Sequence, residues 1–229
     1  MLFNSFNFLF FLVIVFLLYW GLAKDRPKLQ NWILLASSYF FYACWDWRFL
    51  FLIILSSAID YFAGIMIEKS SNGKKFLYLS IFSNLGLLFF FKYFNFFIES
   101  FTILSQNIGI NISQPSLSII LPVGISFYTF QTLSYTIDVY RKQLPACKDP
   151  VIFFAFVSFF PQLVAGPIER AKNLLGQFQK TNKFNEAKAM MGFEQILWGL
   201  FKKVVIADNA GIVVNQIFEN PQNMSSISL

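Results

Sequence analysis

Apolar stretches separated by short polar breaks dominate the first hundred residues. A helix that spans a bilayer needs about 20 predominantly apolar residues. Four stretches approach that length, at residues 6–23, 29–45, 49–67 and 76–94. No basic leader and no A-x-A-like cleavage site precedes Lys24, so the first stretch does not look like a cleaved signal peptide. We therefore predict four membrane-spanning helices, the first of them retained.

The charges in the polar breaks predict an orientation. Basic residues gather in the first break, 24–28, and in the third, 68–75, whereas the second break, 46–48, is nearly balanced. Loops rich in Lys and Arg stay in the cytoplasm. We therefore expect the first and third breaks to be cytoplasmic, and the N-terminus, the second break and the polar stretch 105–118 to be extracytoplasmic.

The second half of the chain is less regular. Residues 119–140 mix polar and apolar positions, residues 151–165 are strongly apolar but interrupted, and residues 168–186 are polar and basic. A last helical segment over about 187–207 is predicted to cross the membrane or to lie along its surface. In total we expect an all-α polytopic protein with six or seven transmembrane or re-entrant helical segments, forming one domain over residues 1–229.

Composition narrows the function classes. Hydrophobic residues make up 56% and charged residues 13% of the 229 positions, whereas soluble domains carry about 25% charged residues. These values exclude a disordered chain and an ordinary soluble globule, and a net charge of +6 is too small and scattered for nucleic-acid binding. Two cysteines and no histidine give no metal site.

Asp60 stands inside the third apolar stretch, where an ionisable group is costly. At helical spacing it shares a face with Ser56, Ser57 and Gly64. Ionisable groups inside membranes usually face a protein interior or a water-filled path. Asp60 is thus either part of a substrate path or paired with a neighbour in a close helix–helix contact.

The segment after Pro122 carries a polar stripe. Five residues fall within one narrow arc of a helical wheel: Tyr128, Gln131, Tyr135, Asp138 and Lys142. A helix lying on a membrane surface usually has a face rich in Lys and Arg. This mostly neutral, hydrogen-bonding face favours the lining of a protein cavity, with an interfacial helix or a buried structural network as the alternatives.

Residues 159–170, FFPQLVAGPIER, interrupt an apolar run with Pro161 and with Gly166 followed by proline. Such a break is tolerated at membrane depth only where protein or water satisfies the freed backbone groups. Gln162 and Arg170 are candidate substrate-path residues there, since a helix beginning near Arg170 would offer free N–H groups beside a fixed cation to a phosphate or carboxylate. The alternative is a plain helix break with an arginine that extends to the headgroups.

These segments resemble the membrane-bound O-acyltransferase family, in its alginate O-acetylation branch. Six stretches match in order and cover nearly the whole chain. They are 3–5 with 8–11, 31–45 (NWILLASSYFFYACW), 84–86 with 92–95, 121–140 (LPVGISFYTFQTLSYTIDVY), 159–170 and 199–208 (GLFKKVVIAD).

The resemblance implies a multi-pass acyltransferase of the cell inner membrane, with helices in a ring around a funnel. It implies an acetyl group moved from cytoplasmic acetyl-CoA toward the hydroxyl of an extracytoplasmic polysaccharide, with periplasmic partner proteins and no bound cofactor. Family members carry their catalytic histidine in the second half of a chain about twice this long. The present sequence therefore resembles the N-terminal half, and we predict that residues 1–229 alone are inactive.

Physical reasoning alone leaves a second class open. An intramembrane Asp60, a broken apolar segment and a hydrogen-bonding face are also typical of a transporter or channel subunit without chemistry. Such a protein would show an inverted internal repeat, and we find none in the sequence.

Overall fold

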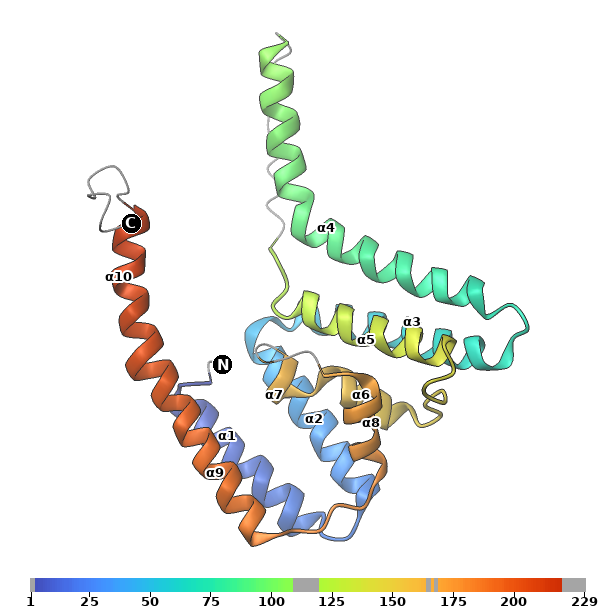
Figure 1. The fold of residues 1–229 in the computed structure, drawn as a ribbon, viewed down its shortest axis with the longest axis vertical. Coiled ribbons are helices and arrows are strands. Elements are labelled where there is room, and N and C mark those ends of the chain that lie inside the picture. The colour runs from blue at the N-terminus through green and yellow to red at the C-terminus, as the bar shows by residue number, and fades with distance from the viewer. Residues whose placement is uncertain (1–2, 109–119, 164–165, 167–168, 220–229) are drawn as a thin grey trace. The chain divides into compact units, whose positions relative to one another are not determined.

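The computed structural model describes residues 3–108, 120–163, 166 and 169–219. Every regular element within these ranges is a helix (Figure 1). In chain order they are α1 (Phe6–Leu17), the π-helix η1 (Leu18–Leu22), α2 (Pro27–Asp46), α3 (Arg48–Lys69), α4 (Gly73–Asn107), α5 (Ile125–Tyr140), α6 (Pro150–Ser158), α7 (Phe160–Leu163), α8 (Ala171–Gln179), α9 (Glu186–Phe201), the π-helix η2 (Lys202–Ala207) and α10 (Asp208–Glu219). The predicted all-α class is confirmed.

The apolar stretches of the sequence form the helices, with some differences in length. Two helices, α3 and α4, are long and apolar enough to cross a membrane, while Phe6–Leu22 and Pro150–Leu163 are apolar but shorter. The fourth helix continues to Asn107 instead of ending near residue 94. At 1.5 Å per residue its 35 residues reach about 52 Å, more than the hydrocarbon thickness of a bilayer. Most of the predicted outer stretch 105–118 lies outside the described residues.

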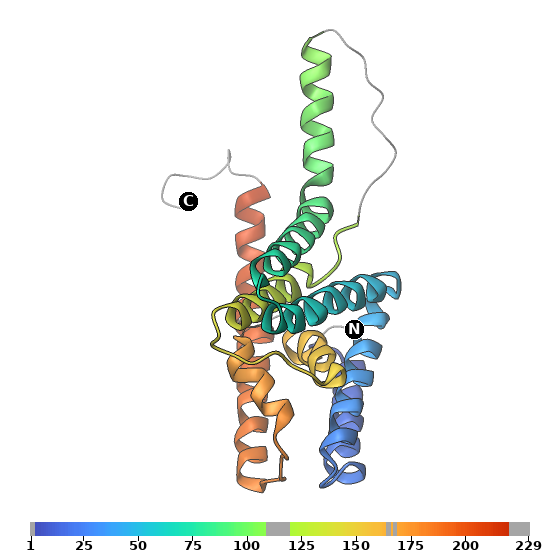
Figure 2. The ribbon, with the colours of Figure 1, turned by 90° about the vertical axis from the view of Figure 1, so that its right-hand side faces the viewer.

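The chain divides into two compact units. One is Val15–Asn182, and the other joins the N-terminal residues up to Ile14 with those from Lys183 onward. In the first unit, α3 packs most extensively against α4 and α5, and α2 packs against α6. Figure 2 shows this layered packing from the side. The core of this unit is aromatic, with Tyr128, Tyr135, Phe153 and Phe156 fully buried.

Helix α8 occupies a region that is polar and basic in the sequence. Its apolar positions, Leu174, Leu175 and Phe178, are buried, while Lys172 is exposed. The helix packs against α5 and α6. Hydrophobic residues recurring three and four positions apart within a basic stretch explain this amphipathic helix.

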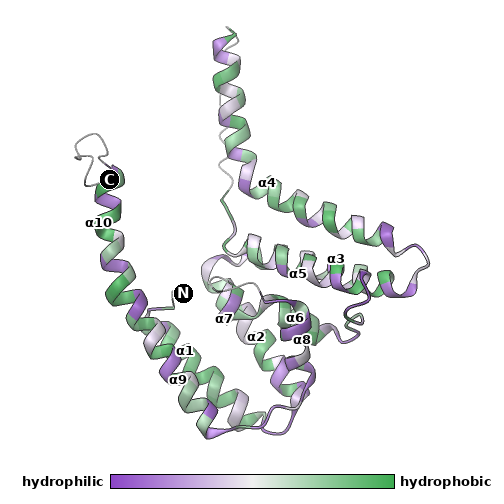
Figure 3. Cartoon of the chain, viewed as in Figure 1, coloured by the Kyte–Doolittle hydropathy of each residue, from purple (hydrophilic) through white to green (hydrophobic). Residues whose placement is uncertain are grey.

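The second unit contains a continuous helical path from Glu186 to Glu219, made of α9, η2 and α10. None of its residues is buried. Figure 3 shows hydrophobic residues on many exposed turns of this path and of α4. Large apolar side chains exposed in this way suit contact with lipid or with further protein.

Candidate functional site

The polar stripe of α5 points into the protein. Tyr128, Gln131 and Tyr135 are nearly inaccessible, and Asp138 is 9% exposed. Burial of these four side chains argues against the interfacial-helix alternative, in which this face would meet headgroups, whereas Lys142 at the end of the stripe is exposed. Whether these residues line a substrate path stays a prediction.

Gln131 and Ser38 form hydrogen bonds with the backbone groups that are freed at the break between α6 and α7. The helical path is interrupted at Phe159, whose ψ is 104°. The Phe160 N–H donates to Ser38 Oγ at 3.2 Å, and the Phe156 carbonyl accepts from Gln131 Nε2 at 2.9 Å. In a continuous α-helix these two backbone groups would bond to each other. The expected partners for the freed backbone groups are therefore present as side chains of α2 and α5.

The start of α5 lies directly on the end of α7. Gly124 has a φ of +77°, and a Cβ at this position would be 2.5 Å from the carbonyl oxygen of Leu163. Only glycine fits both the left-handed backbone and this close approach. Tyr42 adds a second contact, because its hydroxyl donates to the Val123 carbonyl at 2.9 Å. The three sequence stretches 31–45, 121–140 and 159–170 thus meet at one place in the fold.

Tyr128 follows Gly124 by one turn of α5. Its side chain is 1% exposed, and among the described residues its hydroxyl is the buried side-chain polar atom without a hydrogen-bond partner. Buried polar groups are nearly always satisfied, so an unpartnered hydroxyl calls for an explanation such as a ligand or an ordered water. This makes Tyr128 the candidate of the stripe with a free hydrogen-bonding atom.

Gln162 and Arg170 lie on either side of a segment that is only partly described. Gln162 is half-buried on α7, and Arg170 is exposed at the residue before α8. A helix does begin directly after Arg170, as the sequence predicts. Residues 164–165 and 167–168, including the proline of the Gly-Pro pair, lie outside the described residues.

Asp60 lies in a buried network that joins α3, α4 and α5. The carboxylate accepts from Ser80 Oγ at 2.6 Å and from Asn84 Nδ2 at 2.8 and 2.9 Å. Asn84 Oδ1 in turn accepts from Ser56 Oγ at 3.0 Å and lies 3.4 Å from Thr132 Oγ1. This arrangement is the one expected if Asp60 pairs with neighbours in a helix–helix contact. A role of Asp60 in a substrate path stays a prediction.

The network also fixes the helix directions. Ser56 and Asp60 of α3 meet Asn84 and Ser80 of α4 in reverse order, so the two helices are antiparallel. Thr132 and Thr136 of α5 meet the same pair, Asn84 and Ser80, in reverse order as well. Helix α5 therefore runs parallel to α3, and the loops that follow α3 and α5 lie at the same end.

Tyr135 connects α5 to the loop after it. Its hydroxyl accepts from the Cys147 N–H at 2.9 Å, and its ring lies against Gly64 of α3. Burial raises the pKa of the Cys147 thiol to about 11. The loop is also fixed by Tyr61, whose hydroxyl donates to the Lys148 carbonyl at 2.7 Å. The predicted residues thus have different structural roles. Gln131 bonds the backbone at the α6–α7 break, Tyr135 bonds the loop after α5, and Asp60 belongs to a separate network.

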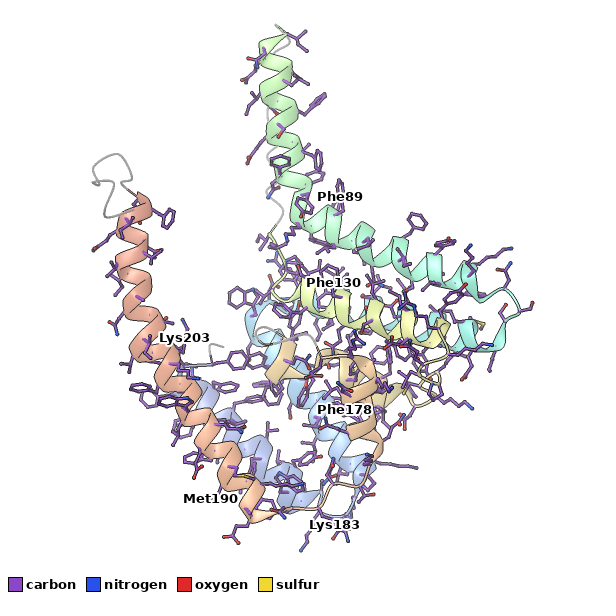
Figure 4. The ribbon with its side chains drawn as sticks, viewed as in Figure 1. Phe89, Phe130, Phe178, Lys183, Met190 and Lys203 are labelled. Carbon is purple, nitrogen blue, oxygen red and sulfur yellow. The ribbon has the colours of Figure 1, made fainter. Side chains whose placement is uncertain are left out.

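The structure also shows an unpredicted feature in the stretch 199–208. Here the helix takes π geometry over Lys202–Ala207. Lys203, labelled in Figure 4, forms an ion pair with Asp208, five residues later. Lys202 lies over the ring of Trp198 at 5.3 Å. A π-turn brings residues five apart together, and such turns are frequent at functional sites. The sequence gives no period that reveals it.

The exposed apolar side chains, together with two helices long and apolar enough to cross a bilayer, are typical of a membrane protein. Comparison with known proteins gives the family. The chain is 36% identical over 233 residues to the probable alginate O-acetylase AlgI of Pseudomonas putida and 37% identical over 233 residues to that of Pseudomonas aeruginosa, in both cases covering 96% of the chain. It is 36% identical over 260 residues to the peptidoglycan O-acetyltransferase of Helicobacter pylori, covering 99% of the chain. The chain therefore belongs to the membrane-bound O-acyltransferase family.

The match extends over only part of each relative. The chain covers 46%, 43% and 48% of these three proteins, so it spans about half the length of the curated relatives it matches. No family model matches the sequence. No solved structure matches it.

Proposed function

We propose that this chain forms about half of a membrane O-acetyltransferase that acts on a polysaccharide. The single observation that supports this most strongly is the similarity to O-acetylating proteins along nearly the whole chain. The names of these relatives refer to alginate and to peptidoglycan, which both contain sugar hydroxyls. The acceptor we propose is accordingly an extracytoplasmic polysaccharide, reached with periplasmic partner proteins.

The donor we propose is cytoplasmic acetyl-CoA. In the transfer, the sugar hydroxyl oxygen attacks the thioester carbonyl, the new C–O bond forms, and the C–S bond breaks. The hydroxyl proton goes to a base, and the thiolate of coenzyme A takes up a proton. A histidine is suited to this near neutral pH. These 229 residues contain none, and the family resemblance assigns it to the second half.

The part that this chain contributes is a buried surface around the start of α5, which includes Tyr128. Support comes from the unpartnered Tyr128 hydroxyl and from the broken helix α6–α7 beside it, because a broken helix is typical of a cavity lining in membranes. We propose that Tyr128 donates a hydrogen bond to the substrate in this enzyme. Gln131 and Ser38 stabilise the adjacent break between α6 and α7 by bonding its backbone groups.

The test is the Tyr128→Phe variant of the full-length enzyme, with Tyr140→Phe as the control, because Tyr140 is exposed. If Tyr128 contacts substrate, acetylation falls about tenfold, the value of one hydrogen bond of about 1.4 kcal/mol, while the thermal midpoint stays equal or rises. Unchanged acetylation would remove Tyr128 from the substrate path. Absence of acetylated polysaccharide in cells that contain the unmodified full-length enzyme, acetyl-CoA and the periplasmic partner proteins would overturn the proposed function itself.

A further inference from the structure

The loops after α3 and α5 form a cavity that the sequence does not indicate. Because α3 and α5 are parallel, residues 70–72 and 141–149 lie at one end of the helices. A cavity of about 670 Å³ opens between them. Its polar lining includes Glu68, Ser70, Ser71 and Lys142, and its apolar lining includes Val139 and Leu144.

The surroundings of this cavity are strongly basic. Residues 68–75 and 141–149 together carry six basic and two acidic side chains. The basic residues are Lys69, Lys74, Lys75, Arg141, Lys142 and Lys148. Of these, Lys142 lines the cavity itself, together with the acidic Glu68, and the excess of positive charge lies in the flanking residues, where it attracts anionic ligands.

Glu68 has a structural role in the lining. One carboxylate oxygen accepts from the Ala146 N–H at 3.2 Å, which joins the end of α3 to the loop after α5. Ser70 Oγ accepts from the Asn72 N–H at 3.1 Å. The hydroxyl hydrogen of Ser70 is still available as a donor, so the lining combines one ammonium group with hydroxyl donors.

Lys142 has a left-handed backbone conformation that glycine usually adopts at the end of a helix. It has a φ of 58°, and the Gln143 N–H bonds back to the Asp138 carbonyl at 2.9 Å, as in a helix end with a left-handed residue. A lysine in this conformation is less stable than a glycine. A residue that costs stability while its side chain lines a cavity points to a use for that side chain.

We propose that this cavity binds a phosphate ester, with Lys142 as the charged contact and the serine hydroxyls as additional donors. Phosphate oxygens accept several hydrogen bonds at once, which suits an ammonium group beside hydroxyls. The charge pattern puts this end of the helices on the cytoplasmic side. Two sources of the ligand share this chemistry, the headgroup of an anionic phospholipid and a soluble phosphate ester such as coenzyme A.

The test uses the purified full-length protein in detergent and measures saturable binding by calorimetry. The probes are coenzyme A without an acetyl group, short-chain phosphatidylglycerol, and short-chain phosphatidylcholine as the neutral-headed reference. Binding of coenzyme A identifies a soluble ester, and binding of phosphatidylglycerol over phosphatidylcholine identifies a lipid. Neither measurement needs acetyl transfer, so a failure here is distinct from a failure of the proposed function.

The variants are Lys142→Gly and Lys142→Asn, since both residues accept a left-handed backbone, with Lys28→Gln as the control on another basic break. We expect the bound probe to lose at least tenfold in affinity with both Lys142 variants and to keep its affinity with K28Q. The thermal midpoint of unliganded K142G should be equal to or above that of the original protein. If neither probe binds, or if K28Q weakens binding as much as K142G, the proposal is overturned.

Discussion

Gln131 and Ser38 bind the two backbone groups that the break at Phe159 separates. Gln131 Nε2 donates to the Phe156 carbonyl, and Ser38 Oγ accepts from the Phe160 N–H. The two side chains belong to different helices, α5 and α2, and both are buried. The backbone groups freed by the break between α6 and α7 are therefore bonded by side chains of two other helices.

This relationship predicts that Gln131→Leu destabilises the protein. The Phe156 carbonyl would be left buried without its partner, at a cost of about 1–3 kcal/mol. The thermal midpoint of the full-length protein in detergent measures this. Ser134→Ala is the matched control, because Ser134 Oγ bonds only within α5, to the Gln131 carbonyl at 2.8 Å. Equal midpoints for Q131L and S134A would contradict the assigned role of Gln131.

The Asp60 network predicts a reciprocal rescue between α3 and α4. Asn84→Asp places a second carboxylate against Asp60, so we expect a strong loss of folded protein from repulsion and unpaired acceptors. Asp60→Asn combined with N84D restores one carboxylate and one amide at the same contact. Folded yield by size-exclusion chromatography should recover in the double variant. A double variant as poor as N84D would show that the order of the two groups matters and that the pair is not interchangeable.

The sequence predicted most of the helices, because each apolar run is long and clearly bounded. It did not predict the partners of Asp60. Ser80 and Asn84 are four residues apart in an apolar helix, and this spacing was the available signal. Ser38 gave no such signal, since its role depends on a break 121 residues later in the chain, at Phe159.

The cavity and the π-helix could not be predicted for a different reason. The cavity depends on α3 and α5 being parallel, which is fixed by contacts of both helices with α4. The π-turn at Lys202–Ala207 changes the spacing of side chains without changing the apolar pattern. In contrast, the polar stripe of α5 is visible in the sequence, and the burial of Tyr128, Gln131, Tyr135 and Asp138 follows the predicted face.

Cys147 is predicted to react slowly with thiol reagents. Its side chain is buried, and a pKa raised to about 11 leaves about 0.1% thiolate at pH 8, whereas an unperturbed thiol near 8.5 is substantially ionised. Because the thiolate is the reactive form, labelling should rise about tenfold per pH unit until the pH approaches 11. Mass spectrometry of N-ethylmaleimide adducts measures the rate at each cysteine. The same cysteine in denaturant is the control, and equal rates in native and denatured protein would show that the loop does not bury the thiol.

The Lys203–Asp208 ion pair predicts that the membrane level of the full-length protein depends on these two residues having opposite charges. The two groups lie near the middle of a helical path with many apolar side chains, where an unpaired charge is costly if the path is covered by lipid or protein. Lys203→Asp places two carboxylates five residues apart on the π-turn, so we expect the membrane level of the full-length protein to fall several-fold. Adding Asp208→Lys reverses the pair and should restore more than half of that level, as measured by immunoblot of isolated membranes. Lys188→Gln, a charge change in the first turn of α9, is the control and should leave the level unchanged. If K203D and K188Q behaved alike, the ion pair would have no part in stabilising this helix in the membrane.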